Sequence, residues 1–196
     1  YTYNIPGTYN VALAATSDYG CIDSIIKPIN IHPKPEADFA KSNVCMYDAA
    51  SFSDISTVSS GTISAWQWDF GDGNIGTDQN PFNQYSPDGL YNIQLIVTTD
   101  NGCLDTIVQS IYVNEVPQAD FSFSNECFYK ALSFQDLSIL NTVNIQTWQW
   151  DFDDGSNSTM QNPSNLYNTH GTYNVTLTIA SDSGCLDSII KPAIAH

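Results

Sequence analysis

The sequence contains two copies of one short pattern, and the spacing of these copies limits what the chain can fold into. They are residues 66–73 (WQWDFGDG) and 148–155 (WQWDFDDG). Large apolar residues alternate with polar ones, which predicts a strand that buries one face. The closing Asp-Gly pair favours a turn. All four tryptophans lie in these two segments. We therefore expect each segment to be the central strand of its own domain.

Other residues recur in the same register of 82 positions, without a gap. Cys45 matches Cys127, and Cys103 matches Cys185. The register also continues backwards, so that Tyr3, Gly7, Tyr9 and Cys21 match Tyr85, Gly89, Tyr91 and Cys103. A period this long, with one core per unit, predicts a string of domains and not a solenoid. We assign residues 1–34 to the C-terminal part of a repeat and residues 35–116 and 117–196 to whole repeats.

Turn signals divide residues 35–116 into about seven short strands. We expect these strands near residues 36–42, 49–54, 64–70, 74–77, 81–86, 90–98 and 104–113. No useful helical period is present, so the predicted class is all-β, with each repeat a two-sheet sandwich. Residues 1–34 supply only the last two strands of such a domain. Their apolar face would be exposed alone, and we expect the natural protein to extend further toward the N-terminus.

The charge balance excludes several partners. The chain has 21 acidic residues against 5 basic ones, a net charge of −16. Nucleic acids and anionic membranes require lysine and arginine to neutralise phosphates, so we expect neither as a partner. No apolar run is long enough to span a bilayer, and membrane insertion is not expected. The acidity is typical of a soluble exposed surface, and divalent cations are the alternative explanation.

The WxWDFGDG strand, the Asn80-Pro81 pair, Tyr85, the GLYNI segment at 89–93 and the DNG turn at 100–102 together resemble the PKD domain. The resemblance covers both whole repeats and the partial one. It implies an immunoglobulin-like sandwich that serves as an extracellular spacer, adhesion unit or accessory module of a secreted enzyme. Two departures are visible. Asp153 replaces a glycine of the motif, and Asn83 and Asn165 stand where the family often has histidine.

Catalytic chemistry has little support in the sequence. His32, His170 and His196 do not recur in register, and no nucleophile elbow or phosphate-binding loop is present. Asp69 and Asp72 follow a core strand, where capping of a turn is the expected role. Some PKD domains bind calcium, but loops 55–64 and 137–147 contain no carboxylate. We predict no catalytic residue, no cofactor and no metal site.

Five cysteines without a CxxC pair predict structural disulfides in an oxidising compartment. Pairing of Cys45 with Cys103 and of Cys127 with Cys185 inside each repeat is one possibility. In an immunoglobulin-like domain, however, the loop after the first strand, which holds Cys45, and the loop before the last strand, which holds Cys103, lie at opposite poles. A strand of six residues spans about 20 Å, whereas a disulfide needs Cα atoms within about 7 Å. A head-to-tail string brings Cys45 toward Cys185 instead, which is the favoured pairing. Cys21 and Cys127 would then pair with repeats beyond this segment.

A short motif recurs three times, as CIDSI at 21–25, CLDTI at 103–107 and CLDSI at 185–189. The Asp-(Ser/Thr)-aliphatic core resembles the O-glycosylation acceptor of certain type IX-secreting Gram-negative bacteria. The resemblance implies glycans on Ser24, Thr106 and Ser188. The alternative is a hydroxyl on an edge strand with no modification.

These observations predict a non-enzymatic extracellular segment of a long secreted bacterial surface protein, working as a stalk, adhesin or filament. Its partners would be the neighbouring repeats of the same chain, like chains in a fibre or surface glycans. The alternative is a carbohydrate- or protein-binding accessory module of a secreted hydrolase.

Overall fold

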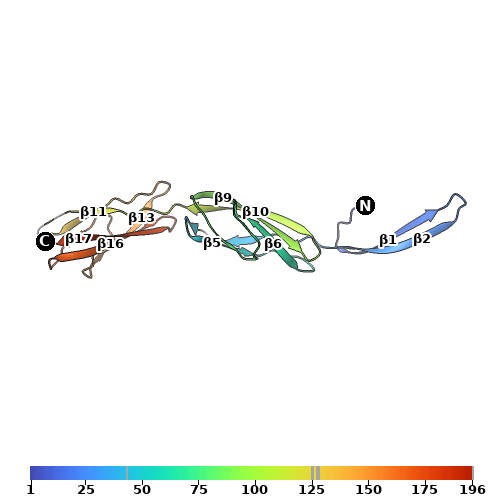
Figure 1. Cartoon of the computed structure of the whole chain (residues 1–196), viewed down its shortest axis with the longest axis horizontal. Coiled ribbons are helices and arrows are strands. Elements are labelled where there is room, and N and C mark those ends of the chain that lie inside the picture. The colour runs from blue at the N-terminus through green and yellow to red at the C-terminus, as the bar shows by residue number, and fades with distance from the viewer. Residues whose placement is uncertain (43, 125, 127–128, 196) are drawn as a thin grey trace. The chain divides into compact units, whose positions relative to one another are not determined.

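The computed structural model describes residues 1–42, 44–124, 126 and 129–195, and all regular structure among them is β (Figure 1). The strands are β1 (Gly7–Thr16), β2 (Ile22–Ile31), β3 (Phe39–Lys41), β4 (Val44–Cys45), β5 (Ala49–Asp54), β6 (Ile63–Asp69), β7 (Ile75–Gly76), β8 (Phe82–Gln84), β9 (Gly89–Thr99), β10 (Leu104–Asn114), β11 (Phe121–Phe123), β12 (Leu132–Asp136), β13 (Ile145–Asp151), β14 (Asn157–Ser158), β15 (Ser164–Asn165), β16 (Gly171–Ser181) and β17 (Leu186–Ala195).

The chain separates into two compact units, and the division does not follow the repeats. The first unit holds residues 1–42, 50–83 and 91–111, and the second holds residues 44–49, 84–90 and 112–195. The segment that carries Cys45 therefore groups with the third repeat. Each unit is described by itself below.

In the first unit, β1 and β2 form an antiparallel hairpin that pairs Tyr9 with Ile29 and Leu13 with Ile25. The second repeat has a three-stranded sheet in the order β3-β5-β8 and a five-stranded sheet in the order β4-β10-β9-β6-β7. Aromatic rings join the two sheets. Phe39 of β3 meets Trp68 of β6 edge to face at 5.2 Å, which is a favoured geometry for aromatic pairs.

The third repeat repeats this arrangement in the second unit. Its sheets have the orders β11-β12-β15 and β14-β13-β16-β17. Phe121 meets Trp150 edge to face at 5.1 Å, and both rings are buried. Tyr167 closes the core, where its hydroxyl donates to the Phe152 carbonyl at 3.1 Å and burial raises its pKa to about 12. The tryptophan-bearing segments are thus the central core strands expected from the sequence.

The predicted all-β class and the immunoglobulin-like sandwiches are confirmed. The sequence pattern did not predict β4. Residues 44 and 45 were expected in a loop, but they form a short strand parallel to the end of β10, where Val44 pairs with Val113. A two-residue strand carries no alternation that a sequence pattern could reveal.

Candidate functional site

Cys185 is held by a tight turn between β16 and β17. The backbone N–H of Ser181 donates to the Cys185 carbonyl at 2.9 Å, and the Cys185 N–H donates to the Ser181 hydroxyl at 3.1 Å. Gly184 has a φ of +85°, a conformation that other residues rarely adopt. The turn leaves the Cys185 side chain buried.

Cys45 is held by β4 and by the turn that follows it. The backbone N–H of Met46 donates to the Asn114 carbonyl at 2.8 Å, and the Asp48 N–H donates to the Cys45 carbonyl at 3.1 Å. In the structure, Cys45 and Cys185 form a disulfide with a Cα–Cα distance of 5.7 Å, across a sequence separation of 140. Both residues belong to the second compact unit.

Cys21 and Cys103, the other cysteines of the CxDxI motif, sit in turns of the same kind as the Cys185 turn. Thr99 and Cys103 exchange the same two hydrogen bonds, at 2.9 and 3.1 Å, and Ser17 and Cys21 do so at 2.9 and 3.2 Å. Cys21 and Cys103 carry free thiols in the structure. The alternative bridge from Cys45 to Cys103 is therefore not present. Cys127 lies outside the described residues.

The acids after the tryptophan strand cap a turn. Asp69 accepts the Gly71 N–H at 2.9 Å, and Asp72 accepts the Asn74 N–H at 2.9 Å and the Asn83 side-chain amide at 2.7 Å. Asn83, which stands where the family often has histidine, thus ties the turn to β8. Asn165 and Asp154 make the same contact in the third repeat, at 2.8 Å.

Asp153 replaces the glycine of this turn without loss of the conformation. At Gly71 an added Cβ would lie 2.5 Å from the Asn92 carbonyl oxygen. Asp153 keeps a φ of +63°, and its carboxylate accepts the Asn174 backbone N–H at 2.8 Å. Aspartate tolerates this region better than most residues because its short polar side chain bonds locally.

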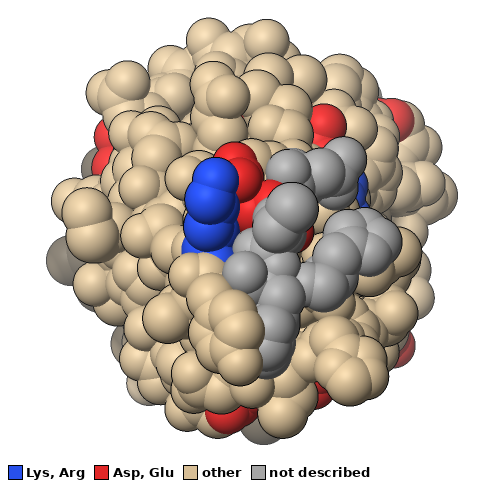
Figure 2. All heavy atoms as spheres, turned by 90° about the vertical axis from the view of Figure 1, so that its left-hand side faces the viewer, with Lys and Arg blue, Asp and Glu red and all other residues tan. Residues whose placement is uncertain are grey.

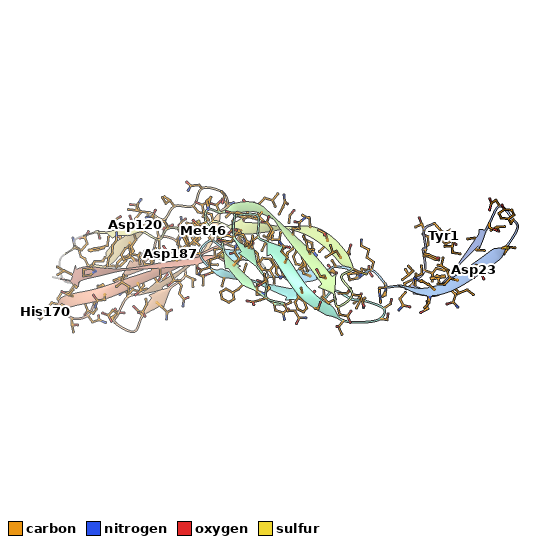
Figure 3. The ribbon with its side chains drawn as sticks, turned by 45° about the vertical axis from the view of Figure 1, so that its right-hand side comes forward. Tyr1, Asp23, Met46, Asp120, His170 and Asp187 are labelled. Atoms are coloured by element: carbon orange, nitrogen blue, oxygen red, sulfur yellow. A yellow bond between two sulfur atoms is a disulfide. The ribbon has the colours of Figure 1, made fainter. Side chains whose placement is uncertain are left out.

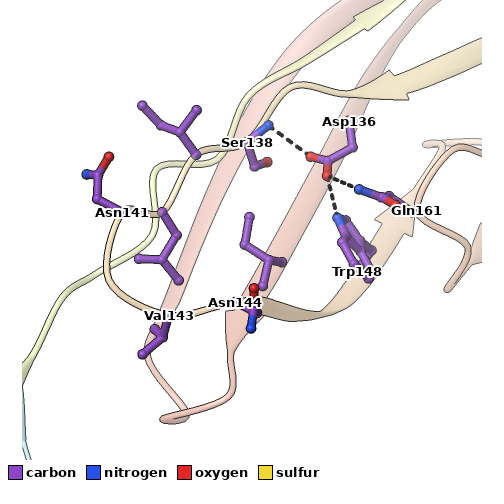
Figure 4. Close-up of a pocket in the computed structure, with 10 residues that line it drawn as sticks. Asp136, Ser138, Asn141, Val143, Asn144, Trp148 and Gln161 are labelled. Carbon is purple, nitrogen blue, oxygen red and sulfur yellow. Dashed lines mark hydrogen bonds between the residues drawn. The ribbon is translucent and has the colours of Figure 1, made fainter.

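Asp136 lines a pocket beside the tryptophan strand β13 of the third repeat (Figure 4). Asp136 accepts the indole N–H of Trp148 at 2.7 Å, the Gln161 amide at 3.1 Å and the Ser138 backbone N–H at 3.0 Å. Asp54 has the equivalent three partners in the second repeat. Because both carboxylate oxygens already accept hydrogen bonds, this pocket fits a structural role better than proton transfer.

The aspartate of the CxDxI motif has a role that the sequence pattern did not reveal. Asp105 accepts the Ala37 backbone N–H at 2.8 Å, and Asp187 accepts the Ala119 N–H at 2.7 Å. The hydrogen bond from Ala37, followed by one from Lys34, lowers the pKa of Asp105. The recurring ADF segments at 37–39 and 119–121 were the available signal.

The hydroxyl residues of the same motif lie on the outside of the strands. Ser24, Thr106 and Ser188 are all exposed, on β2, β10 and β17. No described group of three or more His, Cys, Asp or Glu side chains could hold a metal ion. In the view of Figure 2, acidic side chains are scattered among uncharged ones, and lysine atoms are few.

The fold and these contacts define tandem immunoglobulin-like sandwiches whose polar side chains mostly fasten turns and strands. The family model of the PKD domain matches residues 30–115 and 114–193. The chain belongs to the PKD domain family. Among the described residues, no helix is long and apolar enough to cross a membrane.

Curated relatives include proteases that carry related domains. The pre-pro-metalloprotease PrtV of Vibrio cholerae is 28% identical over 137 residues, which are 68% of this chain and 15% of that protein. Collagenase ColA of Bacillus cereus is 31% identical over 85 residues, which are 43% of this chain and 8% of that protein. The chain thus spans a small part of the length of these relatives.

Two solved structures are similar to single repeats. The PKD1 domain of the Vibrio cholerae metalloprotease PrtV is 34% identical, with a TM-score of 0.39. The match covers 41% of this chain and 96% of the PrtV domain. The PKD1 domain of Vibrio anguillarum Epp is 26% identical, with a TM-score of 0.40, and covers 42% and 96% respectively.

Proposed function

We propose that this chain is a non-enzymatic structural or adhesive segment of a longer extracellular protein. The observation that carries the proposal is the Cys45–Cys185 disulfide, which links residues of two consecutive repeats. An accessory domain that only holds a ligand does not require such a bridge. A segment that must keep its repeats connected benefits from it directly.

The proposed location follows from the same bridge. Disulfides persist in oxidising compartments, which for a bacterial protein means the cell envelope or the exterior. The exposed hydroxyls of Ser24, Thr106 and Ser188 are proposed glycan sites on this surface. Cys21 and Cys103 sit in turns equivalent to the one that holds Cys185. We propose that each forms a disulfide with a cysteine of another repeat.

A second candidate function is supported by the relatives. These relatives are a metalloprotease and a collagenase, so a PKD segment can belong to a protein that degrades other proteins. This chain would then be an accessory module that binds a protein or glycan substrate. The large exposed side chains Tyr47 and Phe82 are the type of group such binding would use.

Two measurements test the proposal, the first its location and the second its lack of a binding role. Intact cells of the native source are treated with a membrane-impermeant biotin reagent, and the chain is expected to be labelled, because we place it outside the cell. The purified 196-residue chain is then tested on insoluble collagen and on a glycan array. A structural segment is expected to show no retention at micromolar concentration. Saturable retention, lost in Tyr47→Ala or Phe82→Ala, would exclude a purely structural segment and support a binding role, as in the accessory module.

A further inference from the structure

The β1–β2 hairpin carries an exposed apolar face, whereas the equivalent faces of the second and third repeats are buried. Val11, Leu13 and Ile25 line an open hollow together with Tyr3, Lys27 and Ile29. Leu13 is 66% exposed, whereas Leu95 and Leu177, its equivalents at intervals of 82 residues, are fully buried. The hairpin therefore presents the core side of a sandwich without its cover.

The third repeat shows what covers this face. Leu177 and its neighbour Val175 belong to one buried cluster with Phe121, Phe134 and Trp150. These aromatic residues all come from the front half of the repeat, before β16 begins. The strand register of the two hairpins is also the same, because Leu13 pairs with Ile25 as Leu177 pairs with Ile189. The hairpin is thus already in the geometry that accepts a front half.

Two polar side chains on β2, Asp23 and Lys27, constrain the strand that would cover this face. Asp23 corresponds to Asp187, which accepts the Ala119 backbone N–H at 2.7 Å. Asp23 lies on β2 (Figure 3). Asp105 binds the Ala37 N–H in the same way at 2.8 Å. An extended segment with a backbone N–H at this position therefore fits Asp23, and both described repeats have alanine there.

Lys27 is the second anchor. It corresponds to Lys191, whose ammonium group lies 2.5 Å from the Asp120 carboxylate and 2.6 Å from the Phe121 carbonyl oxygen. In the second repeat, Gln109 donates to Asp38 and to the Phe39 carbonyl, at 3.0 Å each. The hairpin has the lysine, so it favours an aspartate followed by an aromatic residue, because the Lys191 ammonium also lies 5.2 Å from the centroid of the Phe121 ring. Together the anchors fit a strand like the two described Ala-Asp-Phe segments.

The free edge of β1 adds a third requirement. In the third repeat, β16 pairs with β17 on one side and with β13, the tryptophan strand, on the other. In the described part of the chain, β1 pairs only with β2. Its outer edge therefore presents unpaired backbone N–H and C=O groups to a further strand, and main-chain hydrogen bonds can hold that strand.

The turn before β1, at Tyr3, matches the turn that joins the front half of the third repeat to β16. Tyr3 packs on Tyr9 with ring centroids 4.3 Å apart, as Tyr167 packs on Tyr173 at 4.0 Å. The Tyr9 hydroxyl donates to the Ile5 carbonyl at 2.8 Å, and Tyr173 makes the same bond at 2.9 Å. In the third repeat this turn leads directly from the front half into β16.

We propose that this face is a docking surface for the front half of a PKD repeat, supplied by the stretch of the same polypeptide that leads into Tyr1. That stretch carries an Ala-Asp-Phe strand, held by Asp23 and Lys27, and a Trp-x-Trp-Asp strand, paired with the outer edge of β1. Neither of the described Ala-Asp-Phe strands is available, because Asp38 and Asp120 are engaged within their own repeats.

The test compares the 196-residue chain with an extended chain that carries a copy of residues 115–164 directly before Tyr1. Hydrogen exchange is measured at the amides of β1, and binding of an apolar fluorescent dye is measured in parallel. In the extended chain, exchange at Leu13 is expected to slow by at least about 100-fold, because opening then requires unfolding of a domain. Dye binding is expected to fall. Equal exchange and equal dye binding in the two chains would overturn the proposal.

Matched variants of the extended chain identify the face. Leu13→Asp is expected to remove the protection of β1. Ile26→Asp is expected to retain it, because Ile26 lies on the other face, where its equivalent Ile190 stays 63% exposed. Lys27→Met is expected to reduce the protection. Protection of β16 serves as the internal control for folding. Loss of protection with Ile26→Asp alone would contradict the assignment.

Two further outcomes concern the source of the cover. Protection of β1 in the 196-residue chain that appears only at high concentration, together with a dimer in sedimentation, would identify a second copy as the occupant and overturn the proposal. Peptide sequencing of the native polypeptide is expected to find Ala-Asp-Phe and Trp-x-Trp-Asp segments before Tyr1. Their absence would also overturn it.

Discussion

The Asp105 carboxylate accepts a hydrogen bond from the backbone N–H of Ala37 at 2.8 Å, which fastens the start of the second repeat to its last strand. Lys34 lies 2.6 Å from the same carboxylate but is largely exposed, so the ion pair adds little. Asp187 and Ala119 form the equivalent hydrogen bond in the third repeat. In each of these two repeats, one carboxylate of the last strand thus holds the start of the repeat.

This contact predicts a pH dependence. The pKa of Asp105 is lowered by its hydrogen bonds, so its contribution to stability is complete above the unfolded-state pKa, near 3.8, and is lost as the pH falls through the folded-state value. Asp105→Asn is expected to reduce the free energy of unfolding by about 1 kcal/mol at pH 7. The difference from the unsubstituted chain should disappear once the pH falls below the folded-state pKa of Asp105.

Urea unfolding at a series of pH values provides the measurement. Asp78→Asn, a change at an exposed acid of the same repeat, is the matched control and should have no such effect. A difference between Asp105→Asn and the unsubstituted chain that stays constant from pH 7 to pH 2 would contradict the role of the charge.

Trp68 should be a main source of stability in the second repeat. It is fully buried between Phe39 and Phe52, and its indole N–H donates to the Asp78 carbonyl at 2.9 Å. Trp68→Ala is expected to cost about 3–5 kcal/mol, because it opens a cavity in a small core. Chemical denaturation followed by circular dichroism measures the loss. Ile75→Ala, at a side chain that is 75% exposed, should stay within about 0.5 kcal/mol.

The disulfide can be tested by chemistry. Alkylation of the unreduced chain is expected to modify Cys21 and Cys103, which carry free thiols in the structure. Non-reducing peptide mapping should then recover one linked pair, Cys45 with Cys185. A linked peptide that contains Cys45 and Cys103 would show that the repeats close internally.

Single-molecule stretching should detect the same bridge mechanically. When the two ends of the chain are pulled, a closed bridge removes the residues between Cys45 and Cys185 from the path of the force. The separation is 140 residues, which at about 3.3–3.6 Å per residue corresponds to roughly 50 nm of extension. Reduction with dithiothreitol is expected to release this length. Cys185→Ser should extend fully without reductant, and an extension independent of reductant would exclude the bridge.

Glycans are expected on Ser24, Thr106 and Ser188 in protein from the native source. All three hydroxyls are exposed on strands, so a transferase could reach them without unfolding of the domain. Mass analysis of intact peptides measures the occupancy. Asp187→Asn changes the acceptor motif and keeps Ser188, so it should reduce the glycan at that position. Unmodified peptides at all three positions would remove the hypothesis.

The sequence predicted the cores well because their signal is local and large. Trp68 and Trp150 alternate with polar residues, and both are fully buried. The register of 82 positions also placed the equivalent residues correctly, since Leu95 and Leu177 occupy the same buried position. Such patterns depend on burial of one face of a strand, which repeats every second residue.

The polar contacts could not be predicted because they join residues far apart in the chain. Asp105 and Ala37 are 68 residues apart, and no local pattern marks them as partners. From the CxDxI motif, the sequence predicted a role for the hydroxyl residue, as a glycan acceptor. In the structure it is the aspartate that makes a contact, with the backbone N–H of an alanine. Asn83 was noted only as a departure from the family, and its contact with Asp72 depends on the fold of the turn.

The bridge from Cys45 to Cys185 also changes what a protease can achieve. The two cysteines enclose most of the second and third repeats in one covalent ring. A single cut anywhere between them opens the ring but leaves both products in one molecule, so nothing is released. Release of part of the chain requires a cut outside the ring, a second cut inside it, or reduction of the bridge. The segment can therefore be nicked in an exposed loop and remain whole.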